Sequence, residues 1–319
     1  MSGHQAAEHA EVVAVLGTVS WDEFLVLDRL PTPGSTAIIQ QRVEAGGGTA
    51  ANLAVALARL GVRPLFVTTV GSDRFGAALL AELEQENIAL HIIPRPAGTA
   101  TDRCTILVTP GPERTILWHP GAHLRLGDPL PLDRVFQARI VVIDVEDQAL
   151  RQFLLDLPAH IAPRVQLVGP LTHLTALPAE RALRTAIQHD VLVGSEAELL
   201  AVTGCDQLRT AVETLQQWMP LGATRLAAIT RGRDGCVLVS EREIVSCPPF
   251  AVDAVDPTGA GDAFTAGLIY GLLERLPLPE LGRFANAVGV LATRRLGARS
   301  ALPTRDEVLE FIAQAQPCS

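Results

Sequence analysis

Two segments of this 319-residue chain combine glycine with a polar side chain at the start of an apolar helical pattern. The early segment, Gly46–Asn52, opens with three consecutive glycines and ends on an asparagine. The late segment, Asp253–Phe264, contains two glycines just before Asp262. Glycine lets a backbone approach a ligand closely, and the start of a helix offers free N–H donors. Each segment is therefore a candidate ligand-binding turn, and an ordinary flexible turn before a helix is the alternative.

The late segment has the residue types that phosphoryl transfer needs. Pro257 and Gly259 require a turn, so the backbone N–H groups of Gly259, Ala260 and Gly261 can converge on one point as an anion hole. Asp262 follows in the first helical turn, where the helix dipole favours its ionised form. Such a carboxylate could accept a proton from an attacking hydroxyl. The alternative is that Asp262 only stabilises the helix start.

The basic residues exclude several other ways of handling phosphate. All 26 are arginine, because the sequence contains no lysine. This excludes a Walker A lysine, a protein-kinase strand lysine and a Schiff-base lysine. The net charge of −9 argues against nucleic acid as a partner. Five scattered cysteines, the lack of a signal peptide and the lack of a long apolar run lead us to expect a cytoplasmic chain with no membrane partner.

The early segment also fits a weaker pattern. Gly46-x-Gly48-x-x-Ala51 matches the dinucleotide-binding fingerprint in form. The preceding Ile38–Ala45 is too polar for a buried central strand, and it is not the first strand of the chain. A dinucleotide oxidoreductase therefore stays a third alternative.

The elements that must position these segments alternate along the chain. Short apolar runs typical of strands buried on both faces are separated by helical patterns, which predicts an α/β fold with a mostly parallel sheet. The strands are expected at Val12–Gly17, Pro64–Val70, Ile140–Val145, Val165–Val168, Val191–Val193 and Leu226–Ile229. The helices are expected at Ala50–Leu60, Phe75–Leu83, Gln148–Leu157, Ala179–Gln188, Ala211–Trp218, Gly261–Leu273, Leu281–Leu296 and Arg305–Ala315.

Two regions break this alternation. Ser35–Val43 is polar and extended, and Asp102–Thr109 and Arg114–His119 resemble a hairpin around the turn Pro110–Glu113. They predict a β appendage that serves as a lid, a dimer contact or an insertion. We expect one domain over residues 1–319, with the appendage at about 33–45 and 100–120.

Together, Gly47–Gly61 and Asp256–Phe264 resemble the two signatures of the ribokinase-like (PfkB) carbohydrate kinase family. The resemblance runs from about Val12 to Pro303, with some ketohexokinase-like features. It implies a three-layer α/β/α sandwich with a small β-lid. It also implies transfer of the γ-phosphoryl of ATP, with Mg²⁺, to a sugar hydroxyl.

The resemblance assigns roles residue by residue. The catalytic group comprises Asp262 as general base and the amides of Gly259, Ala260 and Gly261. The sugar contacts are Asp22, Gly47, Gly48, Asn52 and Glu146, the last at the end of a strand Ile140–Glu146. The nucleotide contacts are Thr230, Gly232, Gly235, Asn286 and Arg114, with Arg103 as a weaker candidate. The cation contacts are Glu198 in a Mg²⁺ network and Asp256 in a loop for a monovalent cation such as K⁺.

Several of these residues could instead serve only the fold. Asp22 could cap Glu23–Leu27, and Thr230–Gly235 could be a plain hairpin turn. Ser195-x-x-Glu198 is also a capping box, with serine where the family commonly has asparagine. Ribokinase has lysine where Thr49 stands, and Ala301 replaces a serine of the cation loop.

We therefore expect an ATP-dependent kinase for ribose, fructose or a similar ketose, assembled as a homodimer. One alternative is a nucleoside, 2-keto-3-deoxy-acid or phosphosugar kinase of the same family. Trp21, beside Asp22, keeps a nucleoside acceptor open. Another alternative is a non-catalytic sugar or nucleotide sensor.

Overall fold

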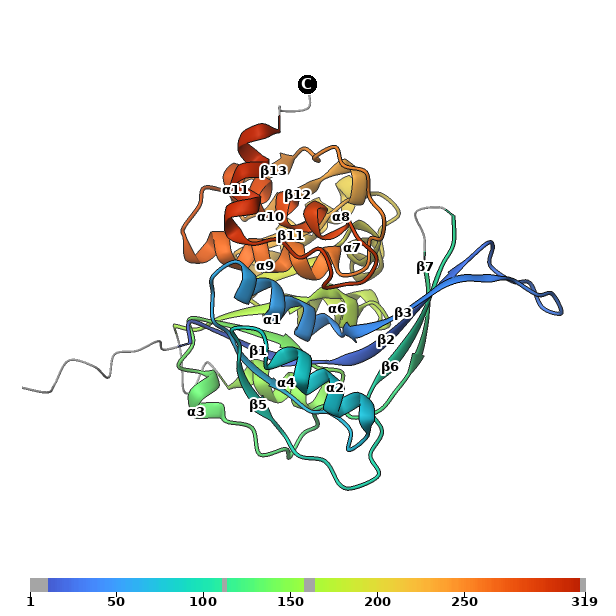
Figure 1. Ribbon diagram of the computed structural model, residues 1–319. Helices are drawn as coiled ribbons and strands as arrows, with labels where there is room; N and C mark the ends of the chain where they lie inside the picture. The colour runs from blue at the N-terminus through green and yellow to red at the C-terminus, as the bar shows by residue number, and fades with distance from the viewer. Residues whose placement is uncertain (1–10, 111–113, 158–163, 316–319) are drawn as a thin grey trace, which may run out of the picture.

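The computed structural model describes residues 11–110, 114–157 and 164–315. Most of the turn expected at Pro110–Glu113 lies outside these ranges. The described residues contain a nine-stranded sheet and a four-stranded sheet with helices around them (Figure 1).

The large sheet has the strand order β13-β12-β11-β10-β9-β8-β1-β4-β5. Its strands from β11 to β5 are all parallel, and β12 and β13 extend it as an antiparallel meander. The strands are β1 (Val13–Gly17), β4 (Leu65–Thr68), β5 (Ala89–Ile92), β8 (Ile140–Asp144), β9 (Gln166–Pro170), β10 (Val191–Ser195), β11 (Leu226–Thr230), β12 (Cys236–Val239) and β13 (Ile244–Cys247). All six expected strands are confirmed, whereas β5 and β13 are strands that the sequence pattern does not predict.

Alternating side chains of the strands divide the core between the two faces of the sheet. Val13 and Val15 of β1 pack on one face, and Ala14 and Leu16 pack on the other. Both sets are fully buried, which explains why the run carries no polar residue. The three-layer arrangement that the family resemblance implied is confirmed.

The helices cover the two faces in separate groups. One face carries α1 (Thr49–Arg59), α2 (Arg74–Leu83), α9 (Ala260–Leu273), α10 (Leu278–Ala292) and α11 (Arg305–Gln314). The other face carries α3 (Leu132–Val135), α4 (Gln148–Asp156), α6 (Ala179–Ala186), α7 (Glu196–Thr203) and α8 (Leu208–Trp218). None of the helices in the described ranges is long and apolar enough to cross a membrane.

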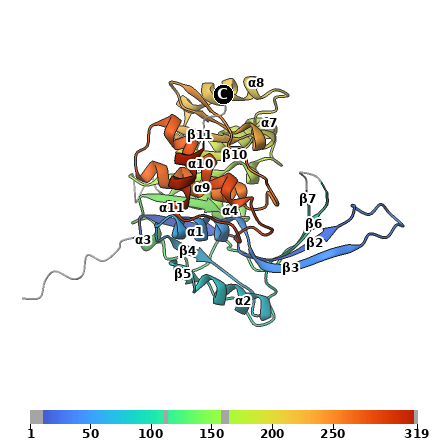
Figure 2. The same cartoon turned by 45° about the horizontal axis from the view of Figure 1, so that its top comes forward.

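The four-stranded sheet projects from one edge of the molecule in both ribbon views (Figures 1 and 2). Its order is β3 (Ile39–Gly47), β2 (Ser20–Leu27), β6 (Arg103–Val108) and β7 (Arg114–His119). We call these four strands the lid sheet. It contains both expected appendage segments, and it also contains β2, for which the sequence analysis did not predict a strand.

The topology brings the glycine-rich segments together. Helices α1 and α9 pack side by side, so their N-terminal ends lie next to each other although 210 residues separate Asn52 from Asp262. The carboxyl ends of parallel strands open toward the same edge, which is the usual ligand site of an α/β sheet.

Candidate active site

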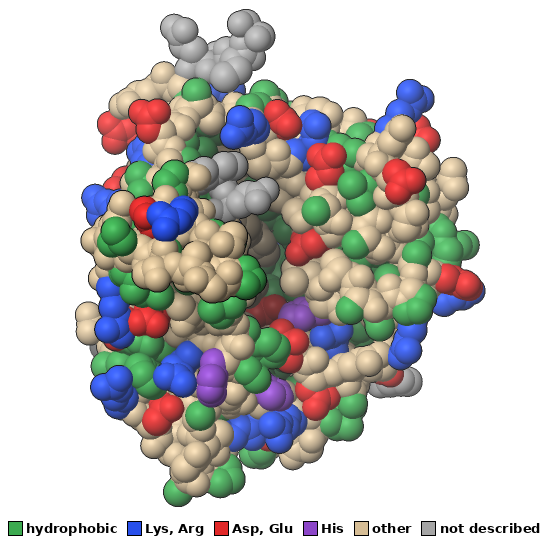
Figure 3. Space-filling view, turned by 90° about the vertical axis from the view of Figure 1, so that its right-hand side faces the viewer, with side chains coloured by type: hydrophobic (Ala, Val, Ile, Leu, Met, Phe, Trp, Pro, Cys, Tyr) green, Lys and Arg blue, Asp and Glu red, His purple; other side chains and the backbone are tan. Residues whose placement is uncertain are grey.

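A cleft of about 750 Å³ lies between the lid sheet and the carboxyl ends of β8, β9, β10 and β11. Figure 3, viewed from the side of the lid, shows this face hollowed, with acidic side chains and a histidine near the bottom of the hollow. The cleft brings together most of the residues that the sequence singled out. The predicted residues that line it are Asp22, Gly48, Asn52, Arg114, Glu198, Thr230, Gly232, Gly259, Gly261 and Asp262.

Asp22 reaches the cleft from the lid strand β2. Its side chain is buried, Ser20 Oγ donates to its Oδ1 at 2.6 Å, and its carboxylate packs directly on Gly47. Burial raises the pKa of this carboxyl, while the Ser20 hydrogen bond and the Arg299 charge oppose the rise. The suggestion that Asp22 caps Glu23–Leu27 is wrong, because these residues continue the strand.

The alternation of β2 sends Trp21 to the other side of the lid sheet. Its ring lies 6.0 Å from the ring of Phe75, and its Nε1 donates to Glu44 at 3.4 Å. Trp21 does not line the cleft. It therefore provides no stacking surface for a nucleoside base there.

The junction of β3 and α1 forms the floor beside Asp22. Gly48 has φ 91° at the N-terminal cap of α1, and a Cβ there would lie 2.6 Å from the Cα of Val19. Glycine is required by both the backbone angle and the space. Asn52 follows in the first turn, where its Nδ2 donates to Asp262 Oδ2 at 2.8 Å and its Oδ1 accepts from Arg299 Nε at 2.8 Å.

Asp262 projects into the cleft from the first turn of α9. Its pKa rises from 3.8 to about 7, mainly because burial disfavours the charged form. The Asn52 hydrogen bond lowers this pKa, the Asp144 charge raises it, and the Arg114 and Arg299 charges lower it. A carboxyl with a pKa near neutral pH suits a general base.

The turn before α9 offers backbone donors beside this carboxyl. Gly259 caps the helix with φ 78°, and the backbone N–H groups of Gly259, Gly261 and Asp262 have no hydrogen-bond partner among the described residues. The N–H of Ala260 instead donates to Pro257 O at 3.2 Å, and Ala260 does not line the cleft. The prediction that the Ala260 amide contributes to an anion hole is therefore wrong, because this amide is engaged. The anion hole itself stays a prediction.

One acidic residue of the cleft differs from the expected one. Strand β8 ends at Asp144, two residues before the expected end, so Asp144 lines the cleft and Glu146 does not. Asp144 accepts from Thr18 Oγ1 at 3.0 Å and lies 2.7 Å from His173 Nε2. Glu146 lies behind it, 3.6 Å from His173 Nδ1. The hydrogen bond to Asp144 raises the pKa of His173, although burial opposes this.

The nucleotide-side candidates divide into two groups. Thr230 and Gly232 line the cleft in the β11–β12 hairpin, and Arg114 reaches it from the lid strand β7. Gly235 and Asn286 do not line it. Asn286 is buried on α10, where its Nδ2 donates to the carbonyls of Cys247 and Pro248 at 3.3 and 3.1 Å. Its contact with adenine stays a prediction.

Glu198 forms the capping box that its spacing allowed. Its Oε2 accepts from the Ser195 backbone N–H at 2.7 Å, and Ser195 Oγ accepts from the Glu198 N–H at 3.2 Å. Its Oε1 accepts from Thr172 Oγ1 at 2.5 Å. Both carboxylate oxygens of Glu198 therefore accept hydrogen bonds within the fold. The residue also lines the cleft.

Asp256 does not line the cleft. Its buried Oδ1 accepts from the backbone N–H and the hydroxyl of Thr258, and its Oδ2 accepts from Gly297 N–H at 2.8 Å. The carboxylate thereby ties the α9 turn to the loop after α10. No cluster of three acidic, histidine or cysteine side chains suited to a metal occurs within the described ranges.

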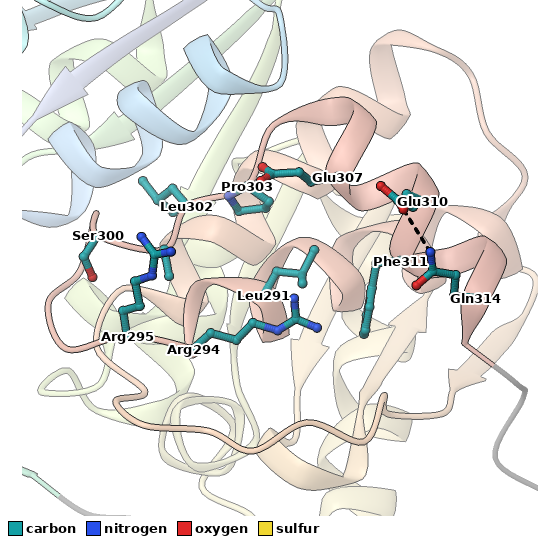
Figure 4. Close-up of a pocket in the computed structure, with 11 residues that line it drawn as sticks. Leu291, Arg294, Arg295, Ser300, Leu302, Pro303, Glu307, Glu310, Phe311 and Gln314 are labelled. Carbon is teal, nitrogen blue, oxygen red and sulfur yellow. Dashed lines mark hydrogen bonds between the residues drawn. The ribbon is translucent and has the colours of Figure 1, made fainter.

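A second pocket, of about 300 Å³, lies between α10, α11 and the loop joining them (Figure 4). The guanidinium of Arg294 stacks 5.0 Å over the ring of Phe311, and Gln314 donates to Glu310 at 2.9 Å. None of the predicted site residues lines this pocket, so the candidate site is the larger cleft.

Comparison with known proteins agrees with this geometry. The model of the pfkB family carbohydrate kinases matches residues 10–305. The chain is 29% identical over 309 residues to a ribokinase of Haemophilus influenzae, covering 96% of this chain and 99% of that protein. It is 30% identical over 316 residues to a probable fructokinase-4 of Arabidopsis thaliana, covering 92% and 96%.

The fold is also found in a solved structure of Arabidopsis thaliana ribokinase complexed with ribose and ATP. The TM-score is 0.78 at 22% identity, and the match covers 95% of this chain and 99% of that one. The family match extends over both glycine-rich segments, the lid strands and the cleft between them. The chain therefore belongs to the pfkB family of carbohydrate kinases.

Proposed function

We propose that this carbohydrate kinase transfers the γ-phosphoryl of ATP to a hydroxyl of ribose, fructose or a similar ketose. The observation that carries the proposal is one cleft lined by the Asp22 carboxylate, the Asp262 carboxylate and the unpartnered amides of Gly259 and Gly261. The first suits sugar hydroxyls, the second suits proton transfer, and the amides suit phosphoryl oxygens.

In the proposed reaction the sugar lies between Asp22 and the start of α1. Asp262 accepts the proton of the attacking hydroxyl, and the hydroxyl oxygen forms the new bond to the γ-phosphorus. The bond from that phosphorus to the β–γ bridging oxygen breaks, and ADP leaves. The amides of Gly259, Gly261 and Asp262 stabilise the charge on the transferring group, as phosphoryl transfer needs mainly positioning and charge stabilisation.

Positive charge for the phosphates would come from an arginine of the lid sheet and from a metal ion. Arg114 lies on the exposed lid strand β7, lines the cleft and lowers the pKa of Asp262 through its charge, so it is placed to contact the phosphates of ATP. Mg²⁺ bound with ATP would neutralise phosphate charge. Mg²⁺ in kinases needs only one or two carboxylates besides phosphates, and Glu198 and Asp144, which line the cleft, are the carboxylates that would hold it.

A monovalent cation near Asp256 remains part of the proposal. The loop that Asp256 ties down includes Gly297 and ends near Ala301, where the family's serine is absent. A K⁺ ion there would act on the α9 turn through the Asp256 carboxylate. Titration of activity with K⁺ at constant ionic strength, with Na⁺ as the control, measures this effect.

We also propose a homodimer that forms through the lid sheet. Four of its large apolar side chains are about half exposed: Ile39, Ile116, Leu117 and Trp118. Light scattering would report twice the 34.0 kDa chain mass, and Leu117→Glu would shift it toward the monomer. With ATP as donor, the proposed reaction belongs in the cytoplasm.

The proposed function is tested by ADP release over pentoses, hexoses, ketoses, nucleosides, a 2-keto-3-deoxy acid and phosphosugars. We expect turnover with a neutral pentose or ketose, and loss of turnover in Asp262→Asn. Asp253→Asn, at an exposed aspartate of the same segment, is the matched control. Turnover with only a nucleoside or with only the 2-keto-3-deoxy acid would mean that this class of compound, and not a sugar, is the acceptor. Binding of ATP and sugar with no turnover would identify a sensor and overturn the proposal.

A further inference from the structure

A buried arginine lies behind the cleft, on the loop between α10 and α11. The Arg299 side chain is only 10% exposed, and it does not line the cleft. Its Nε donates to Asn52 Oδ1 at 2.8 Å, and its Nη2 donates to Gly47 O at 2.5 Å. Its Nη1 lies 3.8 Å from Glu82 Oε2 and has no hydrogen-bond partner among the described residues.

The chemistry of the guanidinium determines how the Asn52 amide is oriented. Arginine only donates hydrogen bonds, so Asn52 must present its Oδ1 to Arg299. The NH₂ group of Asn52 then has to face Asp262, and it donates to Oδ2 at 2.8 Å. Two successive hydrogen bonds thus connect Arg299 to Asn52 and Asn52 to one particular oxygen of Asp262.

These two hydrogen bonds give the two carboxylate oxygens of Asp262 different surroundings. Oδ2 must stay an acceptor, because a proton on that side would face the Asn52 NH₂ group. A proton taken up by the carboxyl therefore belongs on Oδ1. Without Arg299 the amide could rotate and present its oxygen to Asp262, and this distinction would be lost.

The second bond of Arg299 acts on the sugar side of the cleft. Gly47 O is held by Nη2 at the junction of β3 and α1, and a Cβ at Gly47 would overlap the Asp22 carboxylate. The position of the Gly47 backbone therefore sets where that carboxylate can lie. The Arg299 guanidinium therefore binds both Gly47, which packs on the Asp22 carboxylate, and Asn52, which donates to Asp262.

We propose that Arg299 is a positioning residue which, through Asn52, makes Oδ1 of Asp262 the proton-accepting oxygen and, through Gly47, fixes the floor beneath Asp22. The inference rests on the proposed function and deepens it. Arg299 does not touch the substrate.

The electrostatic surroundings supply a readout that a merely structural role would not move. The charged groups that act on Asp262 are Asp144, Arg114 and Arg299, and the two arginines lower its pKa. Those that act on Arg299 are Glu82, Asp22, Asp262 and Glu86. Removal of the Arg299 charge should therefore raise the pKa of Asp262. In a plot of kcat against pH, the acidic limb, where kcat falls as Asp262 is protonated, should then move to higher pH.

The test compares Arg299→Met and Arg299→Lys with Arg59→Met. Arg59 is the matched control, because it is a neighbouring partly buried arginine whose Nη1 donates to the Arg299 carbonyl at 2.9 Å and whose Nη2 lies 2.8 Å from Glu86. Arg59 is not among the groups that chiefly shift the pKa of Asp262.

We expect Arg299→Met to lower kcat about 10- to 100-fold, the range of a lost hydrogen bond to a charged group, with the acidic limb shifted upward. Arg299→Lys should keep the limb near its wild-type position and recover part of kcat. Arg59→Met should lower thermal stability and leave the limb in place. Wild-type kcat and an unshifted limb in Arg299→Met would overturn the inference, as would equal effects of the two methionine variants.

A measurement without turnover separates this inference from the proposed function. The pH dependence of unfolding, compared between chains with Asp262 and with Asp262→Asn, reports the midpoint at which Asp262 titrates. Arg299→Met should raise that midpoint whatever the acceptor is. Binding of ATP and sugar without turnover would overturn the proposed function. An Asp262 titration midpoint that is the same in wild type and in Arg299→Met would overturn the role of Arg299.

Discussion

Replacement of Asp262 by asparagine should stabilise the fold at neutral and alkaline pH. Burial raises the pKa of this carboxyl to about 7, so the folded chain holds a proton that the unfolded chain releases near pH 3.8. Below pH 3.8 the carboxyl is protonated in both states and costs nothing. As the pH rises from about 4 to 7, the free energy of unfolding falls, because the unfolded state binds fewer protons than the folded state. Above pH 7 the full cost is present.

The magnitude follows from the two pKa values. At 1.36 kcal/mol per pH unit, the separation between 3.8 and about 7 corresponds to about 4 kcal/mol as an upper bound. The asparagine of the variant would not titrate, and its side-chain oxygen could still accept from Asn52. The advantage of the variant should therefore be small at pH 4 and grow by up to about 4 kcal/mol by pH 8.

Urea unfolding of wild type and Asp262→Asn between pH 4 and 8, followed by circular dichroism, measures this difference. Asp253→Asn, at an exposed aspartate of the same segment, is the control for the substitution itself. A stability difference for Asp262→Asn that does not change with pH would refute the reasoning.

Three further predictions concern the other parts of the cleft. Asp22→Asn should raise the sugar KM at least tenfold and leave the ATP KM unchanged, since it weakens charged hydrogen bonds to hydroxyls; an equal rise in both would contradict the assignment. Gly259→Ala should destabilise the fold by about 1–3 kcal/mol and lower kcat, because φ is 78° and the new Cβ would lie 2.7 Å from Ala298 O; melting temperature and kcat check this, and a fully active, stable variant would disprove it. Arg114→Ala should raise the ATP KM several-fold at low salt, whereas Arg103→Ala, whose guanidinium stacks 5.0 Å from the Phe75 ring, should not; identical effects would argue against contact of Arg114 with ATP.

The sheet could be predicted from the sequence because its strands are buried on both faces. A short apolar run such as Val12–Gly17 is typical of a central parallel strand, and β1 occupies Val13–Gly17. The lid strand β2 escaped prediction because it alternates buried with partly buried residues and mixes acidic with apolar side chains. Its alternation, with Phe24 buried and Glu23 outside, is a period-2 signal, but the helical alternative after Asp22 concealed it.

Most of the candidate site could be predicted from the two glycine-rich segments, because a turn at a helix start depends on neighbouring residues in the sequence. Gly48 and Gly259 both have positive φ at a helix start, which the sequence patterns indicated. The difference between Asp144 and Glu146 could not be resolved, since it depends on where β8 ends within two residues. Element boundaries are the weakest part of a sequence-based interpretation.

Arg299 gave no recognisable sequence signal. It lies in an irregular loop 247 residues from Asn52, and its role depends on the packing of that loop against α1. With 26 arginines in the chain, its type alone does not distinguish it. Only the three-dimensional arrangement shows that its guanidinium is buried and committed to the glycine-rich segment.

The central claim, that Asp262 accepts the proton during phosphoryl transfer, is tested most directly by a single-turnover quench experiment with Asp262→Asn, ATP and the preferred sugar at pH 8. Calorimetry should show that the variant binds both ligands with affinities close to those of wild type. The account predicts that the transfer step itself is at least about 100-fold slower, the lower range of general-base contributions. Transfer within tenfold of the wild-type rate, with both ligands bound, would contradict it.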